Sequence, residues 1–238
     1  MKFINHRLIL AVLFGLIVFV TSSPFGIETV AAQSAPADCT NINDFTASVA
    51  TTDELDSWIV CFNQAPAGTH TINLTQEIYM TGALTPINNS QSAELIINGN
   101  GFDLDAHYSY RHFIIMGGSV TVENIRLYQG RMVDTLCGDF ACAASVFVDS
   151  PAVATFNNMT FQFSEYAYRS EIESRGGALF VRGLVNIHNS NIDDSRAYYG
   201  GGIYVDGGVL NVYSSVIYHN EAESWGGGIY SVGGPVNL

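Results

Sequence analysis

The sequence predicts an all-β protein, folded as a right-handed parallel β-helix with about 25 residues per coil and a short N-terminal helical cap. Three observations lead to this fold class. Similar glycine-rich segments recur at residues 176–180, 200–204 and 226–230. Each period holds short β-prone segments separated by Gly, Asn and Ser turns, without helical periodicity between them. The period is too short for a propeller blade, whereas three short strands per coil fit it.

Residues 1–32 are expected to be a signal peptide. Lys2 and Arg7 make the start basic, and an apolar run follows at residues 8–20. This run is shorter than the roughly 20 residues of a bilayer-spanning helix, and the small residues at 30–32 suit a cleavage site. An uncleaved membrane anchor is the alternative. In both cases the remaining chain is exported, and after cleavage we expect no transmembrane helix.

Residues 33–68 are expected to form an N-terminal cap that contains one helix. The segment 53–62 has acidic residues at its start and apolar residues at helical spacing, with Thr52 or Asp53 as the N-cap. Trp58 and Phe62 would cover the open end of the first coil. A solenoid needs such a cap because an end coil otherwise exposes its core and its strand edges.

Four cysteines follow the signal peptide, and an even number in an exported chain indicates disulfides. Three pairings are possible, and proximity in sequence favours Cys39–Cys61 and Cys137–Cys142. A zinc site made of all four thiolates is the alternative. It normally shows two short Cys-x-x-Cys spacings, and the first pair here is too widely spaced. We therefore expect no metal.

Residues 69–238 are expected to form about seven coils of three sheets. A degenerate fourth glycine segment lies at residues 143–147. The expected second strands are residues 71–74, 95–97, 120–122, 154–156, 185–187, 210–212 and 236–238, and the third strands include 191–192 and 216–217. Two longer spacings place extra loops at residues 132–141 and 166–174. The last strand stops after three residues, so we expect the β-helix to continue beyond Leu238.

Two short boxes alternate along residues 143–238. The first reads Gly-Gly-Ala-Leu at 176–179 and Gly-Gly-Ile at 201–203 and 227–229, and the second reads Phe-Gln-Phe-Ser at 161–164, Ile-Asp-Asp-Ser at 192–195 and Ile-Tyr-His-Asn at 217–220. This alternation resembles the polymorphic outer membrane protein repeat. Upstream, residues 95–102 resemble the pectate-lyase type of β-helix. The first resemblance implies a secreted or surface-displayed protein, often an adhesin of the outer membrane, and it carries no catalytic residues.

The charge composition excludes several functions. The chain has 9 Lys and Arg against 22 Asp and Glu, a formal net charge of −13, and its one lysine is Lys2. A general nucleic-acid binder needs a basic face, and Schiff-base or P-loop chemistry needs a lysine. Nucleic acid is therefore not an expected partner. An acidic protein also repels a polyuronate unless a cation intervenes.

An enzymatic alternative follows from the fold, because proteins that look like pectate lyase hold Ca²⁺ with several Asp side chains and use Arg or Lys as a base. Asp193, Asp194 and Asp206 with Arg182 or Arg196 would supply such a set. A glycosidase would instead pair two carboxylates, for which Asp193 and Asp194 are an unspecific match. The competing interpretation is a solvated ladder between coils. We favour the ladder, with no catalytic residue, and Ca²⁺ as a cofactor only under the lyase alternative.

Aromatic residues suggest a binding surface. Phe180, Tyr204 and Tyr230 share one column with Phe147, and Trp225 lies just before a glycine box. An outward strip of such rings would stack on sugars; the alternative is that the column packs against neighbouring coils. The leading hypothesis is a non-catalytic secreted or cell-surface protein that binds polysaccharide or another cell-surface ligand. The alternatives are a Ca²⁺-dependent lyase or glycosidase, and a structural spacer.

Overall fold

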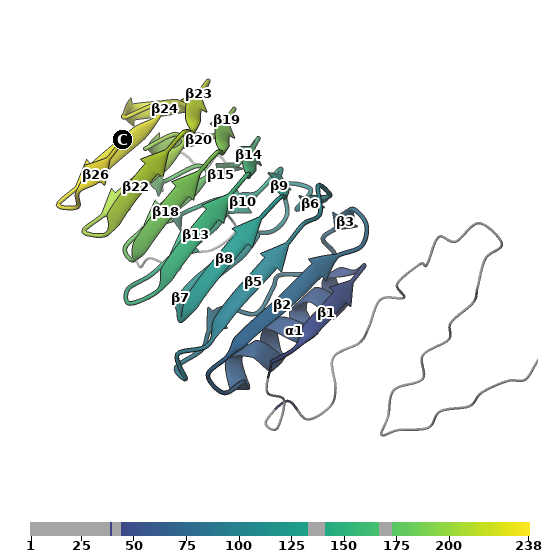
Figure 1. Ribbon diagram of the computed structural model, residues 1–238. Coiled ribbons are helices and arrows are strands. Elements are labelled where there is room, and N and C mark those ends of the chain that lie inside the picture. The colour runs from purple at the N-terminus through teal and green to yellow at the C-terminus, as the bar shows by residue number, and fades with distance from the viewer. Residues whose placement is uncertain (1–38, 40–43, 133–140, 167–172) are drawn as a thin grey trace, which may run out of the picture. The chain divides into compact units, whose positions relative to one another are not determined.

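The computed structural model describes residues 39, 44–132, 141–166 and 173–238 of the chain (Figure 1). These residues belong to one compact unit. The expected signal peptide lies outside the described residues. Within the described part of the chain, no helix is long and apolar enough to cross a membrane.

The described residues form a parallel β-helix, as predicted, with strands of successive coils side by side (Figure 1). Sheet A contains β1 (Thr46–Val49), β2 (Thr69–Leu74), β5 (Glu94–Asn98), β8 (Ser119–Glu123), β13 (Val153–Asn157), β18 (Leu184–His188), β22 (Val209–Tyr213) and β26 (Val236–Asn237). Sheet B contains β3 (Ile78–Tyr79), β6 (Asp103–Asp105), β9 (Arg126–Tyr128), β14 (Thr160–Gln162), β19 (Asn191–Asp193) and β23 (Val216–Tyr218). Both sheets match the second and third strands expected from the repeats.

Sheet C follows the glycine boxes and contains β4 (Ile87–Asn88), β7 (Phe113–Gly117), β12 (Val146–Val148), β17 (Leu179–Val181), β21 (Ile203–Asp206) and β25 (Ile229–Val232). Sheet D contains β10 (Arg131–Met132), β11 (Ala141–Cys142), β15 (Glu165–Tyr166), β16 (Ser174–Arg175), β20 (Arg196–Tyr199) and β24 (Glu221–Trp225). The coil order is therefore A, B, D, C wherever sheet D is present.

Sheet D corrects the expectation of three sheets. In its strand β20, Arg196 is exposed, Ala197 is fully buried and the two tyrosines that follow are half-buried. Alanine has little strand propensity and buries little area, so the segment does not stand out as a strand in the sequence. Pairing with the next coil, through Arg196 with Glu221 and Ala197 with Ala222, makes it a strand.

Alternation of side chains places the core inside the coils. In β5, Leu95 and Ile97 are fully buried while Glu94 and Ile96 are partly exposed, and the same phase recurs in every long strand of sheet A. Because parallel neighbours lie about 4.8 Å apart in register, identical phases stack apolar residues into continuous inward columns. Phe113, Phe156 and Phe161 belong to this core and are fully buried.

Glycine boxes permit close contact between coils. Gly176 and Gly200 have positive φ values of 73° and 62°, where the chain turns into sheet C. At the next position, a Cβ on Gly177 would collide with the backbone oxygen of Gly201 in the following coil. The boxes therefore have a structural role, which is to bring successive backbones closer than any side chain allows.

Helix α1 (Thr52–Gln64) forms the cap and packs against β1, β2 and β4 (Figure 1). Trp58 and Phe62 are buried in the main core, as predicted. The N-cap is Thr51 rather than Thr52 or Asp53, because the Thr51 Oγ1 accepts a hydrogen bond from the Glu54 N–H at 3.2 Å. Thr52 instead joins the helix to the first coil by accepting from the Thr81 N–H at 3.1 Å.

The predicted Cys39–Cys61 disulfide is present, with Cα atoms 5.1 Å apart, and fixes the cap to the segment before β1. The other predicted pair includes Cys137, which lies outside the described residues. Cys142 is buried and disulfide-bonded. Most of the two predicted loops also lies outside the described residues, but their flanking strands β10 and β11, and β15 and β16, all belong to sheet D.

Candidate functional site

The aromatic column lies on the outer face of sheet C. Register pairs Phe147 with Phe180 and Phe180 with Tyr204, and the alternating residues Leu179 and Val181 point into the core. Ring centroids are 5.5 Å apart for Phe147 and Phe180 and 5.2 Å apart for Phe180 and Tyr204. The column therefore faces away from the main core, and its rings contact one another from coil to coil.

Phe180 and Tyr204 are nevertheless buried, which corrects the prediction that they stack on sugar rings. Together with Phe147, Cys142 and Ala143 they form a second, smaller hydrophobic core outside sheet C. The cover is missing from the sequence pattern because it comes from sheet D, which the repeats do not reveal. Here the competing interpretation, in which the column packs against neighbouring coils, is correct.

The column ends in an exposed group of rings. We define the aromatic cluster as Tyr198, Tyr199, Trp225 and Tyr230. Trp225 is 58% exposed, and the three tyrosines are half-buried. Ring centroids are 5.4 Å apart for Tyr199 and Trp225, 5.8 Å for Tyr199 and Tyr230, and 6.0 Å for Trp225 and Tyr230. These three rings are nearly parallel, with interplanar angles of 23° to 31°.

Charged groups surround the aromatic cluster. Desolvation raises the pKa of Tyr199, and the negative charge of Glu173 raises it further. Arg175 lies 3.6 Å from Glu173 and its guanidinium carbon is 5.4 Å from the centre of the Tyr204 ring. The cluster thus combines partly exposed rings with a carboxylate and a guanidinium at its border.

The structure does not assemble the predicted lyase residues. Asp206 pairs with Arg182, with Asp206 Oδ2 2.8 Å from Arg182 Nε, at the end of β21 where the chain turns towards sheet A. Asp193 is the last residue of β19 and Asp194 follows it, at a different corner of the coil. In the described residues no three His, Cys, Asp or Glu side chains are grouped so that they could hold a metal ion.

Arg196 takes part in the predicted ladder. It pairs in register with Glu165 on one side and Glu221 on the other, and Glu165 pairs in turn with Arg131. The Arg196 guanidinium is 3.8 Å from Glu221 and 3.6 Å from Glu223. Opposite charges therefore alternate along sheet D, which occupies this arginine in contacts between coils.

Asp193 is the most unusual carboxylate of the described residues. It is 3% exposed, and its Oδ2 accepts hydrogen bonds from the Tyr218 hydroxyl and from Gln162 Nε2, both at 3.0 Å. Its Oδ1 is buried without a hydrogen-bond partner. Burial raises the pKa of the Asp193 carboxyl; the bonds from Tyr218 and Gln162 lower it, and the charge of Asp194 raises it.

Asp193 belongs to a column that the sequence interpretation missed. We define the sheet B column as the outward residues that pair in register from coil to coil along sheet B. They are Tyr79, Asp105, Tyr128, Gln162, Asp193 and Tyr218. Each follows a residue of the inward apolar column, such as Leu104, Leu127 or Ile192. That phase is the signal for this column that the sequence contains.

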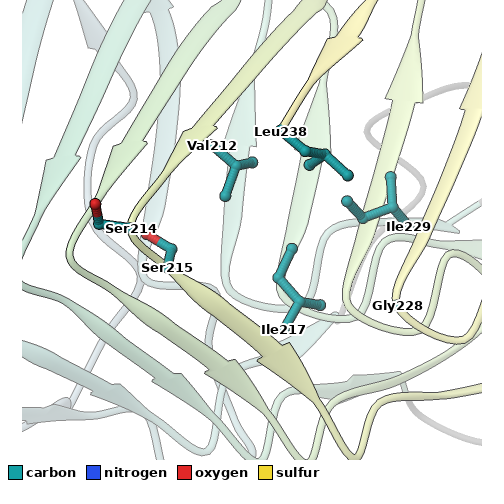
Figure 2. Close-up of a pocket in the computed structure, with 7 residues that line it drawn as sticks. All are labelled: Val212, Ser214, Ser215, Ile217, Gly228, Ile229 and Leu238. Atoms are coloured by element: carbon teal, nitrogen blue, oxygen red, sulfur yellow. The ribbon is translucent and has the colours of Figure 1, made fainter.

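A pocket with a volume of about 570 Å³ lies among the described residues at the C-terminal end of the stack (Figure 2). Its lining consists of Val212, Ser214, Ser215, Ile217, Gly228, Ile229 and Leu238. Val212, Ile217 and Ile229 occupy inward positions of the last coil (Figure 2). The pocket is therefore the inner surface of that coil and is separate from both outer surfaces described above.

Comparisons with protein-family models, with curated proteins and with solved structures find no match to this chain. The resemblance of residues 143–238 to the polymorphic outer membrane protein repeat therefore stays a prediction from the residues.

Proposed function

We propose that this protein is a secreted or cell-surface carbohydrate-binding protein without catalytic activity. The observation that carries the proposal is the aromatic cluster, in which Trp225 and the half-buried Tyr199 and Tyr230 hold nearly parallel rings on an outer surface. A sugar presents an apolar C–H face to such rings and hydroxyl groups to the polar side chains at their border. Glu173 and Arg175 supply those polar groups beside Tyr199.

Export is supported by cysteine chemistry. The Cys39–Cys61 disulfide closes the cap, and stable disulfides persist in oxidising compartments outside the cytosol. A signal peptide at residues 1–32 fits the same location. The exported protein would act on the outside of the cell, where a stack of similar coils can offer several weak contacts to one polymer.

The dispersal of the acidic and basic candidates supports a non-catalytic role. Asp206 is neutralised by Arg182, and Arg196 is shared between two glutamates, so neither arginine is free to act as a base beside Asp193. The lyase alternative has a direct test. Appearance of the ultraviolet absorbance of an unsaturated product from polygalacturonate with added Ca²⁺ would establish an enzyme and overturn the non-catalytic part of the proposal.

Glycan binding by the aromatic cluster is tested with one substitution and a matched control. Trp225→Ala should weaken binding to immobilised glycans by about tenfold, because a ring contact contributes roughly 1–1.5 kcal/mol. Tyr213 is also an exposed aromatic residue of the same coil, but it lies on sheet A, stacked on His188. Tyr213→Ala should bind like the unsubstituted protein.

Two results would contradict the proposal. One is the absence of binding to every glycan of a broad array by the unsubstituted protein. The other is an equal effect of Trp225→Ala and Tyr213→Ala, since equal effects would mean that the loss comes from general damage to the coil.

A further inference from the structure

The sheet B column offers a second surface whose chemistry differs from that of the aromatic cluster. It contributes one outward side chain from each of six consecutive coils, so its length is roughly 24 Å at 4.8 Å per coil. Aromatic, acidic and amide residues are interspersed along this column. The surface is therefore a row of aromatic rings and hydrogen-bonding groups, and the distance between neighbouring side chains is set by the spacing of the strands.

Asp193 carries a buried carboxylate oxygen of this column that has no hydrogen-bond partner in the protein. Its Oδ2 has two donors, whereas its Oδ1 is buried and accepts nothing. Buried polar atoms in native structures are nearly always hydrogen-bonded, so an orphaned carboxylate oxygen needs an explanation. The neighbouring Tyr218 is 39% exposed and donates its hydroxyl to Asp193 Oδ2, so a ligand that reaches Oδ1 would lie beside the Tyr218 ring.

Aromatic residues of the column lie one coil from the carboxyl on one side, at Tyr218, and two coils away on the other, at Tyr128. Tyr218 contacts His219 edge-on at 5.0 Å, and Tyr128 contacts Phe163 edge-on at 5.6 Å, two coils away. The Arg126 guanidinium lies 4.7 Å from the centre of the Tyr128 ring and is paired with Asp103. Rings that border hydrogen-bonding side chains are suited to a ligand with apolar faces and many hydroxyl groups.

The charge of this surface restricts the ligand further. Asp103, Asp105, Asp193 and Asp194 lie on or beside the column, and Arg126 is already neutralised by Asp103. An anionic sugar polymer would meet repulsion here. A cationic one would require exposed carboxylates, yet the two carboxylates of the column itself, Asp105 and Asp193, are only 5% and 3% exposed.

We infer that the sheet B column is a second binding surface for an uncharged glycan, in which Asp193 Oδ1 accepts a hydrogen bond from a sugar hydroxyl beside the ring of Tyr218. This inference rests on the proposed function, and it specifies the chemical class of the polymer. Strand β23, which carries Tyr218, leads directly into β24, which carries Trp225. Both surfaces therefore belong to the same coil.

The test measures binding of the full chain to a neutral galactomannan, to polygalacturonate and to chitosan by calorimetry. Asp193→Asn puts an amide where the acceptor oxygen was and should weaken galactomannan binding by about tenfold or more. Asp194→Asn removes the same charge from an exposed neighbour with φ of 49°, a conformation that asparagine accepts readily, and should leave the affinity within about twofold. Tyr218→Ala should weaken binding, and Tyr213→Ala should not.

A second readout follows the carboxyl itself. The ¹³C shift of the Asp193 carboxyl should change on adding galactomannan, whereas that of Asp194 should not. This measurement, with Tyr218→Ala, decides the matter if Asp193→Asn fails to fold by circular dichroism.

The outcomes separate the two proposals. If the unsubstituted protein binds none of the polymers, the proposed function fails and this inference fails with it. If Trp225→Ala reduces galactomannan binding while Asp193→Asn and Asp194→Asn behave alike, only the inference is wrong. Tighter binding of polygalacturonate or of chitosan than of galactomannan would also overturn it, because the ligand class would then be charged.

Discussion

His112 is a fully buried histidine whose environment favours the neutral ring. Its Nδ1 lies 2.9 Å from Ser145 Oγ, and its Nε2 lies 3.0 Å from the Leu104 carbonyl oxygen and 3.2 Å from that of Tyr128. Burial lowers the pKa of His112 from 6.5 to about 4, against the smaller opposing effect of the two carbonyl groups. The histidine therefore acts as a neutral link between sheets B and C.

The lowered pKa predicts an acid-sensitive contribution to stability. Below pH 6.5 the unfolded chain binds a proton at this histidine, while the folded protein does not until about pH 4. The free energy of unfolding should therefore fall by about 3 kcal/mol as the pH drops from 6.5 to 4, and this contribution should be constant outside that window. Urea unfolding at a series of pH values measures it.

His112→Gln is the comparison that isolates this effect. The variant should lose about 1–3 kcal/mol at pH 8 through its altered hydrogen bonds, but its stability should decline less steeply between pH 6.5 and 4. Other titrating groups contribute similarly to both proteins. Parallel pH profiles for the two proteins would therefore disprove the assigned role of His112.

At the scale of elements, the C-terminal end of α1 depends on one side chain from outside the helix. Asn89 Nδ2 donates to the carbonyl oxygens of Phe62 and Ala65 at 2.5 and 2.9 Å, and its own Oδ1 accepts from the Gln91 N–H at 2.7 Å. The last carbonyl groups of a helix have no partner within the helix. The Asn89 side chain supplies such a partner, and Asn89 is only 2% exposed.

We predict that Asn89→Ala destabilises the protein by about 2 kcal/mol, because it removes the Asn89 donor from the buried Ala65 carbonyl and leaves the Phe62 carbonyl with the Ala65 N–H alone. Asn88→Ala is a matched control, since Asn88 is exposed and contacts the helix through its backbone N–H. Thermal unfolding of both variants measures the difference. An equally small effect of the two substitutions would show that water satisfies these carbonyl groups.

The cap also shows which local features a sequence can predict. The helix, its buried Trp58 and Phe62 and its disulfide follow from spacing within one segment. Its first residue depends on whether Thr51 or Thr52 turns its hydroxyl back to the helix, and Thr52 is bonded to the first coil instead. Asn89 lies 24 residues from Ala65, so its capping role needs the folded coil.

The same distinction holds for the candidate sites. The sequence repeats predicted the aromatic column and its register, because each coil places its inward and outward residues in the same order as the coil before it. Burial of Phe180 and Tyr204 could not be predicted, since it depends on residues of sheet D that repeat only weakly. The hydrogen bonds of Asp193 likewise come from Gln162 and Tyr218, its partners in two other coils.

For the whole molecule, contacts run mainly between neighbouring coils, so stability is expected to be lost from the ends rather than all at once. Replacing Cys39 and Cys61 by serine should lower the free energy of unfolding of the cap by about 3 kcal/mol. Hydrogen exchange should then accelerate in β1 and α1, while β13 in the middle of sheet A keeps its protection. Uniformly faster exchange would indicate that the coils unfold as a single unit instead.

The pairing in sheet D also indicates where this protein tolerates inserted residues. Strand β20 pairs through Arg196 with Glu165 of β15 and through Tyr199 with Arg175 of β16, although β15 and β16 are separate strands of one coil. Residues inserted between those two strands leave the register on either side unchanged. We therefore expect that peptides grafted at this corner leave the neighbouring coils in register, which would make it a position for displaying foreign epitopes.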